Sequence, residues 1–135
     1  MNAQTAPSGT SAKPDVDAIL SALAAQSSGA KLRDAQTFAI EFLRRLPAED
    51  LVSRDAAQWA AIAQGALEFL RDRRPGTAKL RVFNPDANDA ANAASADRSH
   101  SVVEIVTDDM PFLVDSVGMR IAQAGLSVRT VIHPT

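Results

Sequence analysis

The side chains of this chain that could carry out chemistry include three neighbouring aspartates, a serine beside them and the two histidines. Asp108, Asp109 and Asp115 lie in one short segment, where carboxylates could hold a metal ion or transfer protons. Such roles need further partners at converging positions, and the neighbouring sequence offers none. We therefore expect Asp109 to cap a helix, because a carboxylate there accepts amide hydrogen bonds and suits the positive end of the helix dipole.

The remaining candidates lack the partners of a catalytic site. Ser116 has no Gly-x-Ser-x-Gly context and no histidine at helical spacing. His100 and His133 stand at the start of one expected strand and the end of another, so parallel strands would place them at opposite ends of the sheet, too far apart for a shared metal site. The chain has no cysteine and no glycine-rich phosphate loop. We predict no catalytic, cofactor-binding or metal-binding residue in this chain.

A strand, an acidic turn, a helix and a second strand position these residues. Residues 101–107 carry apolar groups on both faces, which favours a central strand. A helix begins at Asp108 or Asp109, tolerates Pro111 in its first turn and ends at Gly125, expected in a left-handed conformation. Residues 126–132 alternate like a second strand. Amides at the helix start could hold an anion, but the aspartates would repel it and Phe112 fills the space.

The first part of the chain has helical periodicity. Helices are expected over residues 14–26, 31–46 and 53–73, with a short turn of helix at 48–52 and an antiparallel pairing of the second and third. Gly65 inside the third helix is either a cost of about 1 kcal/mol or a close helix contact. Residues 1–13 are predicted to be a disordered leader, 79–83 a half-exposed strand, and 86–99 a flexible loop.

Composition excludes several classes of protein. The net charge of −2 gives no reason to expect nucleic acid as a partner. No apolar run approaches the roughly 20 residues of a membrane-spanning helix, so no membrane partner is expected. The absence of cysteine fits a reducing cytoplasm. Hydrophobic residues make up 46% of the chain, but many are alanine, so the core should be small.

The acidic turn resembles that of ACT domains, small βαββαβ modules that sense amino acids or hold oligomers together. Their first strand typically ends in Asp-x-Pro-Gly-Leu-Leu, and Asp109-Met-Pro-Phe-Leu-Val114 occupies that place. Phe112 replaces the glycine that lets a ligand approach the backbone. This departure favours a structural or interface role for Asp109, Pro111, Phe112, Asp115 and Ser116.

A more specific resemblance is to the N-terminal region of the large bacterial NAD-specific glutamate dehydrogenases. Three pieces carry it in the same order, residues 81–85, 103–117 and 131–134. The resemblance implies a non-catalytic regulatory or assembly segment of an enzyme whose NAD-binding and glutamate-binding parts lie far downstream. It also implies the rest of the parent polypeptide as a partner, homo-oligomers formed through ACT-like domains, and an amino-acid effector.

We therefore predict an α+β fold, with a helical segment over residues 14–76 followed by the first half of an ACT-like, ferredoxin-like sheet over 77–135. An ACT-like sheet needs a further strand between the two that flank its helix, so we expect the isolated chain to be only marginally stable. The alternatives are a free-standing ACT-like module that senses amino acids or binds proteins, and a helical adaptor with an incidental βαβ unit.

Overall fold

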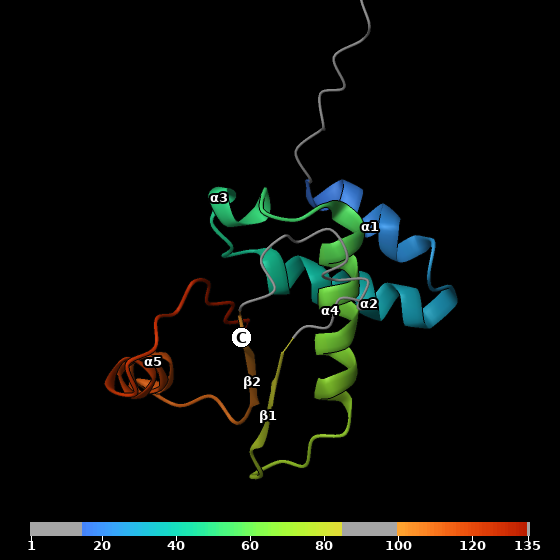
Figure 1. Cartoon of the computed structure of the whole chain (residues 1–135). Helices are drawn as coiled ribbons and strands as arrows, with labels where there is room; N and C mark the ends of the chain where they lie inside the picture. Colours follow the sequence, from blue (N-terminus) through green and yellow to red (C-terminus); the bar gives the residue numbers. More distant parts are fainter. Residues whose placement is uncertain (1–14, 85–99, 135) are drawn as a thin grey trace, which may run out of the picture.

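The computed structural model describes residues 15–84 and 100–134, and the predicted leader at 1–13 and loop at 86–99 lie outside this part. Four helices come first: α1 (Val16–Ala24), α2 (Gly29–Leu43), α3 (Ala48–Leu51) and α4 (Ala56–Arg71). Strands β1 (Lys79–Phe83) and β2 (Val102–Val106) follow, and then helix α5 (Leu113–Gln123). This mixture of helices with a small sheet is the α+β class that the sequence predicts (Figure 1).

Side-chain caps define where two of the helices begin. Asp15 precedes α1 and its Oδ1 accepts a hydrogen bond from the backbone N–H of Ala18 at 2.7 Å. Asp55 and Gln58 form a capping box at the start of α4, with the two side chains and backbone N–H groups bonded reciprocally at 2.8 and 2.9 Å. These contacts satisfy amides that have no partner within the helix.

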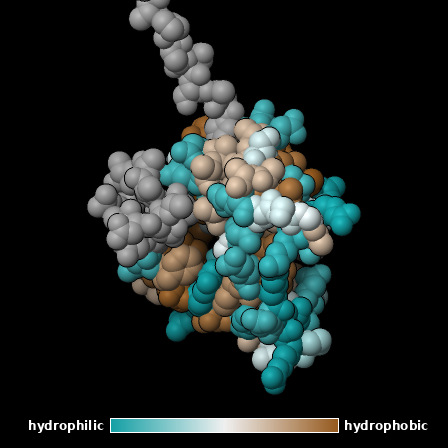
Figure 2. All heavy atoms as spheres, turned by 90° about the vertical axis from the view of Figure 1, so that its right-hand side faces the viewer, coloured by the Kyte–Doolittle hydropathy of each residue, from teal (hydrophilic) through white to brown (hydrophobic). Residues whose placement is uncertain are grey.

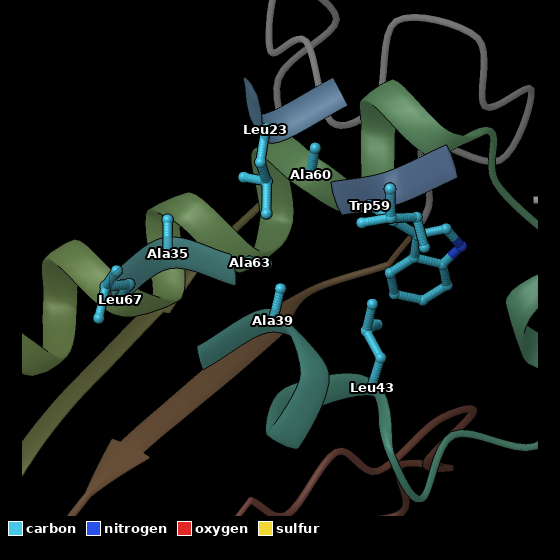
Figure 3. Packing of buried hydrophobic residues seen from close by; sticks show 9 residues of the cluster. Leu23, Ala35, Ala39, Leu43, Trp59, Ala60, Ala63 and Leu67 are labelled. Atoms are coloured by element: carbon cyan, nitrogen blue, oxygen red, sulfur yellow. The ribbon is translucent and has the colours of Figure 1, made fainter. Parts of the chain in front are cut away.

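The buried core lies between α1, α2 and α4, and Figure 3 shows its side chains converging from these helices. It consists of Ile19, Leu23, Ala35, Ala39, Leu43, Trp59, Ala60, Ala63 and Leu67. Four of these nine residues are alanines, which bring the helix backbones close together but bury little area each. Trp59 is the largest side chain of this core, and its indole N–H donates to the carbonyl of Leu51 at 2.8 Å.

The predicted antiparallel pairing of the second and third long helices is wrong. Helix α2 lies across α4 in Figure 1 instead of running beside it. Helix α1 packs against both, so three helices share the core and no two of them form an isolated pair.

The sheet consists of β1 and β2, which pair antiparallel with Lys79 opposite Val106 and Phe83 opposite Val102. The hydroxyl of Ser101 donates to Oδ1 of Asn84 at 2.6 Å, just beyond the last strand pair. The prediction that residues 101–107 form a central strand is wrong for the described residues, because β1 is the only strand that pairs with β2 there. The apolar groups on its second face are consequently exposed at Val103 and Ile105.

The segment after α5 also differs from the prediction. Gly125 ends the helix with a φ of 76°, as expected for a left-handed stop. Residues 126–132 do not form a strand, and the sheet of the described residues consists of β1 and β2 alone. This segment runs back towards the helices (Figure 1), and Ile132 packs against the buried core.

Candidate functional site

Asp108 in the acidic turn contacts the end of α4. Its Oδ2 accepts a hydrogen bond from the backbone N–H of Gly76 at 3.1 Å, and its Oδ1 forms an ion pair with Nη2 of Arg73. Arg73 and Gly76 belong to the turn that joins α4 to β1. The aspartate therefore ties two turns together, a role that sequence spacing could not reveal because the partners are more than 30 positions away.

The prediction that Asp109 or Asp108 caps the following helix is wrong. Phe112 occupies the N-cap position of α5, and no side chain caps this helix. Pro111 restricts the preceding residue to extended conformations, which leaves both aspartates ahead of the first helical turn. Asp109 is exposed.

Phe112 has an unusual conformation and position. Its φ of 63° lies in the left-handed region, where it is the only non-glycine residue among those described. For a residue with a side chain this conformation costs about 1 kcal/mol. Phe112 is 77% exposed, so no burial within the described residues offsets that cost. The Phe112 carbonyl accepts from the N–H of Ser116 at 2.9 Å, the first hydrogen bond of α5.

Asp115 and Ser116 lie in the first turn of α5, and both are exposed, as is Pro111. A carboxylate in the first turn suits the positive end of the helix dipole. The five predicted site residues thus lie along one exposed segment at the start of α5, as their spacing indicates. That arrangement can present side chains to a partner.

The outer face of the sheet is apolar. Leu80 stands opposite Ile105 and Val82 opposite Val103, so the four side chains form two adjacent cross-strand pairs on one face. Leu80 is 64% exposed and Val82 61%. The alternation of residues 79–83 predicts one polar and one apolar face, but the apolar face is the one left open.

The inner face of the sheet carries the charged groups, and it packs on α4. Lys79 Nζ donates to the carbonyl of Phe69 at 2.7 Å and lies 4.6 Å from the centre of its ring. The guanidinium of Arg81 stacks on the same ring, with its Cζ 4.4 Å from the ring centre. Its Nε pairs with Oε2 of Glu104 across the strands at 2.5 Å, and its Nη2 donates to the carbonyl of Gly65 at 3.3 Å. Cation–π contacts and bonds to helix carbonyls therefore join sheet to helix.

A shallow polar depression of about 450 Å³ lies between the α1–α2 connection and α4. It is lined by Gln26, Ser27, Ser28, Lys31, Gln64, Glu68 and Arg71. Its cations are accompanied by Glu68, which opposes anion binding, and it is remote in sequence from the acidic turn. Figure 2 looks at the α1–α2 side of the molecule, where hydrophilic side chains are interspersed with smaller apolar areas.

The described residues contain no group of three or more His, Cys, Asp or Glu that could hold a metal ion. Within the same ranges, no helix is both long and apolar enough to cross a membrane. The resulting class is an α+β module with a three-helix core, a two-stranded sheet and an exposed acidic turn, a combination compatible with an ACT-like N-terminal domain.

Comparison with known proteins identifies the family. The family described as "Glutamate dehydrogenase, ACT1 domain" matches residues 38–135, most of the chain, and the chain belongs to this family. An NAD-specific glutamate dehydrogenase of Halomonas elongata is 30% identical over 101 residues, which cover 75% of this chain and 6% of the relative. The enzyme of the same name from Pseudomonas aeruginosa is 29% identical over 120 residues, covering 88% and 7%. No solved structure matches the chain.

Proposed function

We propose that this chain is a non-catalytic regulatory or assembly segment of an NAD-dependent glutamate dehydrogenase. The chain spans only 6–7% of the length of the curated relatives it matches. The whole enzyme would oxidise L-glutamate to 2-oxoglutarate and ammonia and pass the hydride to NAD. NAD binding and catalysis then belong to other parts of the parent polypeptide, which would act in the cytoplasm.

The observation that carries an assembly role is the exposed apolar surface. Leu80, Val82, Val103 and Ile105 form a continuous face on the sheet, and Phe112 projects from the acidic turn. Contiguous exposed apolar groups mark surfaces that other protein segments cover. We infer that the rest of the parent polypeptide, or the same domain of another subunit, covers this surface in a homo-oligomer.

Sensing of an amino-acid effector is supported less well than assembly. A ligand at this turn would have to approach the backbone where Phe112 stands. Asp109 and Asp115 are exposed there, as is Phe112. An effector would therefore act at a surface completed by a partner segment.

The proposal is tested in a full-length dehydrogenase that contains this region. We expect Phe112→Ser to weaken subunit assembly in sedimentation experiments while the assembled enzyme keeps its KM values for glutamate and NAD. Val52→Ser is the matched control, because Val52 is also exposed but lies after α3, away from the turn.

Two results would contradict an assembly role. One is a Phe112→Ser enzyme with normal assembly and normal kinetics; the other is one with normal assembly but a changed KM. Binding of an amino acid by the 135-residue chain alone, lost in Asp109→Ala, would instead support the free-standing sensory module.

A further inference from the structure

Asp108 joins two turns that are distant in the sequence. One turn connects α4 to β1 and contains Arg73 and Gly76, and the other leads from β2 into α5. Each oxygen of the Asp108 carboxylate has its own partner. Oδ2 accepts a hydrogen bond from the Gly76 N–H at 3.1 Å, and Oδ1 forms the ion pair with Arg73. A single side chain thus connects the turn before α5 to the turn after α4.

Helix α5 has few other attachments. None of its residues is buried, and its apolar stripe of Leu113, Val117 and Ile121 is only half-buried. In Figure 1 the helix lies on the side of the sheet away from α4. An element with little buried apolar surface opens locally at a low cost. The orientation of α5 therefore depends on its two flanking segments, which are the turn that precedes it and residues 126–132, whose Ile132 packs against the core.

We propose that Asp108, Arg73 and the Gly76 amide form a clamp that couples the end of α4 to the position of α5. When the clamp is closed, the turn at residues 107–112 is held against the helical body. When it opens, the turn and α5 move together while the core between α1, α2 and α4 stays intact. The clamp consists only of contacts within this chain and does not require the parent enzyme.

The strength of the contact suits a reversible clamp. The Asp108 side chain is 56% exposed and that of Arg73 is 24% exposed, so water and salt screen the ion pair. Such a contact is weak enough to open reversibly. Its loss should raise the equilibrium constant for local opening of the turn and α5 only several-fold. Arg74 and Asp109, the next residues along the chain, are both exposed and provide charge-matched controls.

Amide hydrogen exchange on the complete chain tests the clamp. We expect Asp108→Ala to raise exchange about 3- to 10-fold at Gly76 and along α5, a range that reflects a screened ion pair plus one hydrogen bond. Exchange in the buried parts of α2 and α4 should not change. Asp109→Ala removes the same charge one residue away and should leave all these rates unchanged.

Two outcomes overturn the proposal. Unchanged exchange in α5 would mean that the contact does not hold the helix, and a uniform rise across all helices would mean that it only stabilises the whole fold. Circular dichroism shows whether Asp108→Ala folds. If it does not, Arg73→Gln removes only the ion pair and should produce the same local pattern to a smaller degree, with Arg74→Gln as its control.

Discussion

Two glycine substitutions should change stability in opposite directions, although neither glycine is crowded. A Cβ built on Gly65 or on Gly76 meets no atom within 4 Å apart from its chain neighbours and, for Gly65, the backbone of its own helix. Gly65 lies inside helix α4, where alanine is favoured over glycine by about 1 kcal/mol. Gly76 has a φ of 75°, where an L-residue is disfavoured by about 1 kcal/mol. Backbone conformation alone therefore decides whether each substitution raises or lowers the stability of the fold.

The expected size of the shift in Tm follows from the length of the chain. For a domain near 100 residues, 1 kcal/mol shifts Tm by about 4 °C. We expect Gly65→Ala to raise Tm by about 4 °C and Gly76→Ala to lower it by a similar amount. Thermal melting followed by circular dichroism measures both. The Arg81 hydrogen bond to the Gly65 carbonyl and the Gly76 N–H donated to Asp108 remain available in the two variants.

A lower Tm for Gly65→Ala would refute this reasoning. It would mean that Gly65 is needed for a close approach of another element, the second of the two interpretations that the sequence allows. A neutral Gly76→Ala would show that the turn after α4 relaxes out of its left-handed conformation.

Three further substitutions test the helical core. Leu23→Ala should lower the free energy of unfolding by about 3 kcal/mol, because Leu23 is fully buried; a loss below about 1 kcal/mol in urea unfolding would mean that the core collapses around the cavity. Asp55→Ala removes the capping box of α4 and should cost about 1 kcal/mol, whereas an unchanged urea midpoint would show that the box contributes nothing. Trp59→Phe leaves the Leu51 carbonyl without its indole partner and should cost about 1–2 kcal/mol, and a neutral result would mean that water replaces the indole.

Local patterns predicted the helical part of the fold well. The helical periodicity of residues 31–46 and 53–73 corresponds to α2 and α4, which contribute Ala35, Ala39, Trp59 and Ala63 to the buried core. Gly125 and the short helix after Pro47 are also confirmed. These features depend on spacing and backbone preference within a few residues, which a single sequence records directly.

Features that depend on distant partners were not predicted. Alternation in residues 79–83 shows that the strand has two different faces, but the apolar face is open because Lys79 and Arg81 find an aromatic ring and helix carbonyls on α4. Residues 126–132 have a strand-like pattern, yet a strand needs a neighbour to receive its hydrogen bonds.

The acidic turn also contains a feature that depends on partners distant in the sequence. Its residue types indicate a helix start, and α5 begins there, although at Leu113 and not at an aspartate. The spacing suggests a capping aspartate, but the carboxylate of Asp108 is engaged by Arg73 and Gly76 instead. The division of the chain at residues 76 and 77 falls in the turn between α4 and β1 and stays a prediction.

The most direct test of the central claim is the mass of the native subunit in an extract of its own cells. An antibody raised against residues 30–76 would detect it on an immunoblot. Our account predicts a band many times larger than the 14.3 kDa of this chain, because the chain would be one segment of the dehydrogenase polypeptide. A band at 14.3 kDa would contradict it and identify a separate small protein.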